Sequence, residues 1–565
     1  MKTNITTKGA AIAASLTLTL SATGVANANL TMPYGTGTTT YSVMNVGSAT
    51  ATVVATYYNP NGTTPPGSGS THTLNVNGRL DITVGQDGPL PPNWSGSVVL
   101  SSDQDIVAVA RTKYTGRPDA NETNPNQTPG TESSAYEAFN SGSTTLYFPV
   151  IVRIRRTLQP TVGQLTTRFT VQNTSASPAT VYVNFRNFNG TTYPPQIITL
   201  NGYGSRTWDT AVDSDLTPPI PASDLNTDVV ALSLVVTGTQ PLVGVAEQSW
   251  NLDGFLGATP VKQNWAADYT AIPPAQAATT LYGPLVARIG TMGGSNWPCT
   301  FAVYTTFFFF TQFAVQNTTA TTATVTATFI RSNISNPSGQ ATGSYTVQVP
   351  PFGTWNVGTF AGGNLGVNQA ASSFWSIFSD GYNPLTGAAT HCNWNGSVVF
   401  TSDQPIVGFG FVQQPLSIQN YASGYNFFSA SGATSTAVLP RADRVCTGSC
   451  DFTAVEQFPD FSGVVVQNVG NANTNLTLTF YNPNGTVNQT FTVDGSNIPI
   501  TLAPGQQYTF NTRAGANASI AQTQALGNNF QGTVRVTASG GVPIRVFNNL
   551  ISGMDDADAY VGFNR

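Results

Sequence analysis

The stretch that decides the fold reads Q-N-T-S-A-S-P-A-T-V-Y-V-N-F and spans residues 172–185. Counted from its Asn173, positions +8, +10 and +12 are the apolar Val181, Val183 and Phe185. An apolar period of two is typical of a strand with one buried face. The phrase recurs with the same spacing from Asn45, Asn317 and Asn468, where it continues in Val53/Ala55/Tyr57, Val325/Ala327/Phe329 and Leu476/Leu478/Phe480. The chain therefore repeats one β unit.

The spacing of these phrases sets the size of the unit. The four asparagines lie 128 to 151 residues apart, which suits a β-sandwich of seven or more strands and is too long for a propeller blade. We predict an all-β protein of four tandem sandwiches strung in line, each contacting its neighbours. The predicted boundaries are residues 29–140, 141–275, 276–430 and 431–565.

Two other phrases recur as strand and turn signals. Each unit opens with a short phrase that ends in proline, at Pro33, Pro149, Pro284 and Pro440. Proline has no N–H for a sheet ladder, so this phrase predicts a first or edge strand. Asn-Pro-Asn-Gly at 59–62 and 482–485, with a near copy at 187–190, predicts hairpin turns that need positive φ.

Recurring aromatic residues mark the core and the end of each unit. Trp94, Trp394 and Phe530 precede equivalent strands, so we expect core plugs there rather than ligand platforms. A closing phrase begins at Tyr136, Tyr269, Tyr425 and Tyr560. We expect its last copy to pack onto its own repeat; the alternative is a docking end for another molecule, formed by Tyr560 and Phe563.

The N-terminal residues are typical of a secretory signal peptide. Lys2 and Lys8 precede a mainly small and apolar stretch, and Ala26-Asn-Ala28 provides a small-x-small cleavage pattern. We predict residues 1–28 as a leader; the apolar stretch is too short for the alternative, a membrane anchor. The protein is expected to be secreted and extracellular or held at the cell surface, with no membrane span.

Composition agrees with export and argues against nucleic acid as a partner. Only 8% of residues are charged, the net charge is −5, and Thr, Ser, Asn, Gln and Gly carry the polarity. Nucleic-acid readers usually show a basic patch. The only basic cluster is Arg153, Arg155 and Arg156, which we interpret as a solvated strand face rather than an anion site.

Four cysteines fit an oxidising compartment. We predict the local disulfides Cys299–Cys392 and Cys446–Cys450, although four cysteines allow other pairings. A zinc site is the rival interpretation, but the spacing fits no zinc motif and the chain has only two histidines, His72 and His391.

Catalytic, metal and cofactor residues are predicted as none. Neither histidine lies in a nucleophile motif. Asp103 and Asp403 recur in one turn, which favours a hydrogen-bonding turn residue over a catalytic acid. Two small acidic clusters, Asp213-Ser-Asp215 and Asp555-Asp-Ala-Asp558, offer oxygen ligands of the kind that Ca²⁺ binds. Neither has the spacing of a known calcium-binding loop, so we expect both to be solvated turns.

Aromatic side chains outside the repeated blocks are the best candidates for recognition. Trp250, Trp265 and Trp297 lie in such segments, where a ring could face a ligand such as a sugar. Surface loops between strands are where binding residues usually lie.

The recurring phrases together resemble the tandem immunoglobulin-like β-sandwich repeats of secreted and cell-surface bacterial proteins. The resemblance rests on the proline openings, the Gln172-Asn-Thr and Gln316-Asn-Thr phrases, the Asn-Pro-Asn-Gly hairpins and the Gly-Ser-Val-Val blocks at 96–99 and 396–399. It implies an extracellular structural or adhesive protein, although fold analogy specifies function poorly.

Three hypotheses about function follow. The first is a non-enzymatic, self-associating component of a surface layer, sheath or filament, whose partners are other copies or cell-surface components. The second is an adhesin or carbohydrate-binding protein that uses loop aromatics and binds glycans. A hydrolase with an unmarked carboxylate pair is the third.

Overall fold

The structure is a computed structural model that describes residues 14–18, 36–86, 88–91, 94–115, 132–158, 161–225, 229–256, 259–290, 307–332, 339–359, 374, 377–378, 393–414, 421–448, 450, 458–493, 499–513, 525–552 and 556–565. Most of these residues lie in antiparallel strands and very few in helices, so the all-β prediction is confirmed.

The first repeat forms two sheets, in the orders β1-β6-β3-β4 and β5-β2-β7-β8. Their strands are β1 (Ala14–Leu18), β2 (Thr36–Asn45), β3 (Ala51–Tyr58), β4 (Ser70–Leu74), β5 (Arg79–Thr83), β6 (Gly96–Ser102), β7 (Ile106–Thr115) and β8 (Glu132–Glu137). β1 lies within the predicted leader, whose cleavage stays a prediction.

The second repeat joins the equivalent strands through one long strand. Its elements are β9 (Ser143–Leu158), β10 (Thr161–Asn173), β11 (Ala179–Asn187), β12 (Gln196–Leu200), β13 (Ser205–Asp209), α1 (Asp213–Leu216), α2 (Ala222–Leu225), β14 (Val229–Leu256) and β15 (Thr259–Thr270). β14 pairs with β11 and β9 in its first half and with β10 and β15 in its second half. One strand therefore belongs to both layers.

The third repeat follows the same plan, whereas the fourth has two separate strands in place of the single long strand. The third contains β16 (Ala278–Gly290), β17 (Phe307–Asn317), β18 (Ala323–Arg331), β19 (Ala341–Val349), β20 (Thr354–Gly358), β21 (Asn393–Gln414) and β22 (Tyr421–Asn426), after the short 3-10 turn η1 (Pro274–Gln276). The fourth contains β23 (Thr436–Val445), β24 (Asp460–Asn468), β25 (Thr474–Tyr481), β26 (Val487–Phe491), β27 (Thr501–Leu502), β28 (Gln507–Asn511), β29 (Asn529–Ala538), η3 (Ser539–Gly541), β30 (Ile544–Ser552), β31 (Asp556–Val561) and β32 (Phe563–Asn564).

The recurring asparagine is a buried connector within each repeat. Asn45 donates from Nδ2 to the carbonyls of Ala49 (2.7 Å) and Leu74 (2.9 Å), and its Oδ1 accepts the N–H of Gly47 (2.9 Å). Asn173, Asn317 and Asn468 make the same set of contacts. One side chain thus satisfies a turn and the end of a neighbouring strand, which explains why the phrase begins with asparagine.

Pro149, Pro284 and Pro440 lie in the first strands of their repeats, as predicted, but these strands are interior to their sheets and are not edge strands. Pro33 lies outside the described residues. β9 runs between β14 and β10, and the register of its pairing with β14 shifts beside Pro149. The same shift occurs beside Pro284 in β16 and Pro440 in β23. A β-bulge leaves one residue outside the ladder, so proline loses no hydrogen bond there.

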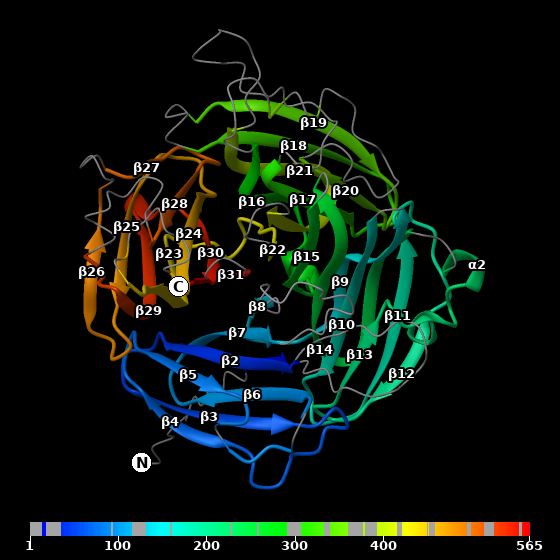
Figure 1. Ribbon diagram of the computed structural model, residues 1–565, viewed down its shortest axis with the longest axis horizontal. Coiled ribbons are helices and arrows are strands. Elements are labelled where there is room, and N and C mark those ends of the chain that lie inside the picture. The colour runs from blue at the N-terminus through cyan, green and yellow to red at the C-terminus, as the bar shows by residue number, and fades with distance from the viewer. Residues whose placement is uncertain are drawn as a thin grey trace, which may run out of the picture.

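The four repeats form a closed ring rather than a line, which corrects the predicted linear arrangement (Figure 1). Each main hydrophobic core includes side chains of the next repeat. The core of the first repeat includes Val245 of the second, that of the second includes Phe409 of the third, and that of the third includes Phe547 of the fourth. The fourth core includes Val109 and Ala135 of the first repeat, which closes the ring.

Candidate functional site at the ring axis

The recurring hairpin turns hold neighbouring repeats together. The carbonyl of Pro60 accepts the N–H of Ser205 (2.9 Å) in the next repeat. Gly62 has φ 85°, and a Cβ there would lie 2.1 Å from the carbonyl oxygen of Gly202. Glycine is therefore required both by the turn and by the close approach of the neighbouring backbone.

The same contact recurs around the ring. In the second repeat, the carbonyl of Phe188 accepts the N–H of Thr354 of the third (3.0 Å). In the fourth repeat, the carbonyl of Pro483 accepts the N–H of Arg79 of the first (2.9 Å), and a Cβ on Gly485 would lie 2.1 Å from the Val76 oxygen. The corresponding turn of the third repeat falls largely outside the described residues.

Four short strands surround the axis of the ring. β8 contacts β15, β15 contacts β22, β22 contacts β31, and β31 contacts β8. Figure 1 shows these strands at the centre of the ring. They carry the closing tyrosines, and the hydroxyls of Tyr269, Tyr425 and Tyr560 donate to the carbonyls of Val150, Leu285 and Arg441 in their own repeats.

The last closing phrase is used inside the molecule. Tyr560 is buried in the fourth repeat, and Phe563 pairs with Val438 of that repeat while packing beside Met44 and Val107 of the first. The arrangement matches the expectation that the phrase packs onto its own repeat. It leaves Tyr560 without the accessible surface that a docking end needs.

Buried ion pairs distinguish the junction between the fourth and first repeats. Asp443 accepts from Arg79 Nη1 (2.5 Å) and Arg441 Nε (2.7 Å), and its side chain is 1% exposed. Arg79 also pairs with Asp81 (2.7 Å). Burial alone would raise the pKa of Asp81, but the neighbouring Arg79 lowers it below its ordinary value.

A second buried cluster lies at the same junction, nearer the axis. Arg111 Nε donates to Asp558 Oδ2 (2.5 Å) and Nη1 donates to Asp460 (2.8 Å). Ser133 donates to the same Asp558 oxygen (2.5 Å). Asp558 belongs to a predicted solvated acidic turn, so that prediction is wrong for this residue, which is fully buried because a guanidinium compensates its charge.

Two carboxyl groups face each other within the second repeat. Glu247 and Asp268 are directly opposite each other on β14 and β15. Burial, and then the charge of Glu247, raise the pKa of Asp268 well above its ordinary value. Two like charges in this position destabilise a sheet, so the pair favours a protonated state of Asp268.

A cavity of about 610 Å³ opens at the ring axis. All four repeats line it through the segments that follow their closing tyrosines, including Glu137, Thr270, Phe428 and Phe563, and Arg545 of β30 also faces it. Its size lies within the roughly 300–1,000 Å³ usual for small-molecule sites. The axial cavity is therefore the candidate site of this molecule.

Four charged residues line the axial cavity: Asp105 and Arg565, which pair with each other (3.0 Å), and Glu137 and Arg545. Glu137 accepts the hydroxyl of Thr270 (2.6 Å), and burial raises the pKa of its carboxyl group. Arg545 donates to the carbonyls of Ser429 (3.1 Å from Nη2) and Ser431 (2.7 Å) and lies over the Phe428 ring. Burial lowers the pKa of Arg545 to about 10.

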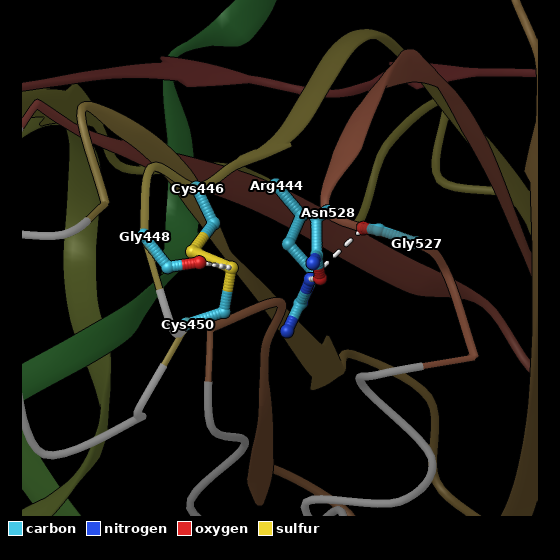
Figure 2. Close-up of a disulfide and its surroundings, with 6 residues drawn as sticks. All are labelled: Arg444, Cys446, Gly448, Cys450, Gly527 and Asn528. Carbon is cyan, nitrogen blue, oxygen red and sulfur yellow. Dashed lines mark hydrogen bonds between the residues drawn. A yellow bond between two sulfur atoms is a disulfide. The ribbon is translucent and has the colours of Figure 1, made fainter.

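One of the two predicted disulfides is confirmed, and the other stays a prediction. Cys446 and Cys450 are bonded, as predicted, directly after β23 (Figure 2). Arg444 lies beside this disulfide and donates to Gly527 and Asn528, each at 2.9 Å. Cys299 and Cys392 lie outside the described residues.

The structure bears only in part on the tryptophans. Trp94, Trp394 and Phe530 are buried, which confirms them as core plugs. Of the ligand-facing candidates, Trp250 and Trp265 are paired across β14 and β15, but their side chains lie outside the described part of the chain. All of Trp297 lies outside it too.

The prediction that Arg153, Arg155 and Arg156 form a solvated strand face is wrong for Arg153. Arg153 is fully buried and not solvated, because it pairs with Asp213 and donates to the carbonyls of Thr210 and Leu225. These partners come from the segment around α1 and α2, some 60 residues along the chain, so the strand pattern alone could not reveal them. The side chains of Arg155 and Arg156 are not among those described.

Other candidate residues have structural partners. Asp103 and Asp403 accept the N–H groups of Thr52 (2.7 Å) and Thr324 (2.8 Å), which agrees with a hydrogen-bonding role. His72 lies on β4 beside Ser70, and His391 lies outside the described residues. In the described ranges, no three His, Cys, Asp or Glu side chains gather in a group able to hold a metal.

No helix among the described residues has the length and apolar character needed to cross a bilayer. The axial cavity itself gave no sequence signal, since its lining comes from segments in all four repeats.

Comparisons with known proteins give little beyond this geometry. No family model and no curated protein matches the chain. The match to a solved structure of the Anabaena sensory rhodopsin transducer covers 19% of this chain and 87% of the transducer chain, with 14% sequence identity and a TM-score of 0.15. The match to the crystal structure of Thermotoga maritima 1070 covers 23% of this chain and 95% of that chain, with 11% sequence identity and a TM-score of 0.16. At these scores, neither likeness bears on the function of the chain.

Proposed function

We propose that this chain is a non-enzymatic, exported structural protein whose closed ring self-associates into a surface layer, sheath or filament. On this proposal its repeats are immunoglobulin-like sandwiches of the kind found in secreted and cell-surface bacterial proteins. The low charge, the predicted leader and the Cys446–Cys450 disulfide support an extracellular location.

The observation that carries the proposal is the chemistry of the outer edge strands. β4, β12, β19 and β26 end their sheets and lie on the outside of the ring (Figure 1). None of these strands contains Lys, Arg, Asp, Glu or Pro. Natural proteins usually protect an exposed edge with such residues, because its free N–H and C=O groups can pair with another chain.

β19 is the edge best suited to association. It is nine residues long and mostly exposed on its outer face. Thr346 and Ser344 there form hydroxyl pairs with Thr326 (2.8 Å) and Thr328 (3.0 Å) of β18. An uncharged face of this kind can pack against a second copy with few ions to desolvate.

A matched pair of lysine substitutions tests the proposal. Thr346→Lys places a charge on the edge strand, and Thr326→Lys places it on the same face one strand inward. We expect ordered fibres or lattices of the wild type in negative-stain microscopy, with assembly lost in Thr346→Lys and kept in Thr326→Lys. Dispersed wild-type rings at all concentrations would overturn the proposal, and rings that also bind a glycan array would favour an adhesin.

A further inference from the structure

The wall of the axial cavity carries a partly buried cation without a carboxylate partner among the described residues. Arg545 lies on β30 and is partly buried. It donates to the neutral backbone carbonyls of Ser429 and Ser431. Elsewhere in the ring, Arg79, Arg111 and Arg153 face aspartates, whereas the buried Arg444 donates to the neutral groups of Gly527 and Asn528 and lines no cavity described above.

The geometry of Arg545 leaves part of its guanidinium available. Nε and Nη2 donate to the two carbonyls, whereas Nη1 makes no hydrogen bond within the described part of the chain. The guanidinium carbon also lies over the Phe428 ring, 5.8 Å from its centroid. A planar group that is held in place on the wall of a cavity is suited to bind a carboxylate.

The rest of the lining limits the charge and shape of a ligand. Glu137 lines the same cavity and has no basic partner among the described residues, so it disfavours a second negative charge. Arg565, also in the lining, is already paired with Asp105 (3.0 Å). Phe139, Phe428 and Phe563 add apolar surface beside these groups.

We propose that the axial cavity binds a small organic monocarboxylate with an apolar body, whose carboxylate pairs with Arg545. The ligand supplies the counterion that the ring lacks at this position, and its apolar part packs against the phenylalanines. We expect a dianion such as phosphate to bind less well, because Arg545 offers a single positive charge beside an apolar lining. This site is independent of the outer edge strands and of the proposed self-association.

Titration calorimetry of the full chain with benzoate, its neutral isostere benzamide and inorganic phosphate tests the site. We expect benzoate to bind at least tenfold more tightly than benzamide and phosphate. Arg545→Gln should abolish the difference between benzoate and benzamide, whereas Arg206→Gln, a control on the second repeat, should keep it.

Several results would overturn the proposal. Equal binding of benzoate and benzamide, absence of any benzoate binding, or tighter binding of phosphate would each contradict it. So would unchanged benzoate binding by Arg545→Gln. Should that variant fail to fold, Arg545→Lys keeps the charge but not the backbone contacts that hold the guanidinium in place, and it should bind benzoate more weakly than wild type without losing the preference over benzamide.

Discussion

Removing the charge of Asp443 should open the ring where the fourth repeat meets the first. Asp443 is 1% exposed and bridges Arg79 of the first repeat and Arg441 of the fourth. In Asp443→Asn the two guanidiniums stay buried and lose their shared counterion. Removal of one partner from a buried ion pair typically costs about 3–5 kcal/mol.

Hydrogen exchange measures that cost at the junction itself. The N–H of Arg79 donates to the Pro483 carbonyl across the interface, so its protection reports the opening of this junction. Since about 1.4 kcal/mol corresponds to a factor of ten, the amide should exchange roughly 150- to 5,000-fold faster in Asp443→Asn.

An exposed ion pair at the same junction provides the control. Asp105 pairs with Arg565, and the two side chains are 50% and 36% exposed. Such a pair is worth less than about 1 kcal/mol, so Asp105→Asn should change the exchange rate by no more than about fivefold. An equally small change in Asp443→Asn would refute the claim that buried charge holds the ring closed.

Three other predictions follow from named contacts. Gly485→Ala should lower the melting temperature more than Gly432→Ala, since both glycines have positive φ but only at Gly485 would the new Cβ meet a backbone oxygen, at 2.1 Å; equal shifts would contradict the inter-repeat contact. Asn317→Ala should lower the free energy of unfolding, measured in urea, by at least about 2 kcal/mol, because it leaves buried carbonyls without a donor. A loss below about 0.5 kcal/mol, the size of an ordinary surface substitution, would contradict the connector role. Asp268→Asn should be more stable than wild type at pH 8 but not at pH 3. Burial raises the pKa of Asp268 above its ordinary value of 3.8. The stability that protonation of Asp268 contributes to the wild type is therefore present below pH 3.8 and is lost as the pH rises through the pKa of the folded state. Parallel melting curves of the two proteins across this range would show that the raised pKa is wrong.

Much of each repeat could be predicted from the sequence, because the signals are local. The period of two around Val181 and Val183 matches the alternating burial of β11. Gly62 has the positive φ that its turn predicts, and the disulfide between Cys446 and Cys450 spans one short turn. In each case the residues that decide the structure are near one another in the chain.

The ring could not be predicted, because its contacts join residues far apart with no shared signal. Gly62 looks like a turn residue whether or not Gly202 lies against it. Arg111 and Asp558 are 447 positions apart, and each resembles an ordinary polar residue of a strand. Arg545 likewise gains its importance only when four separated segments enclose one cavity.

Small-angle X-ray scattering of the monomeric chain tests the closed ring most directly. A compact chain of this length has an expected radius of gyration of about 25 Å, whereas four sandwiches in a line would give roughly 45 Å. The ring predicts the smaller value, unchanged on dilution. A value near the larger one would contradict the closure between the fourth and first repeats.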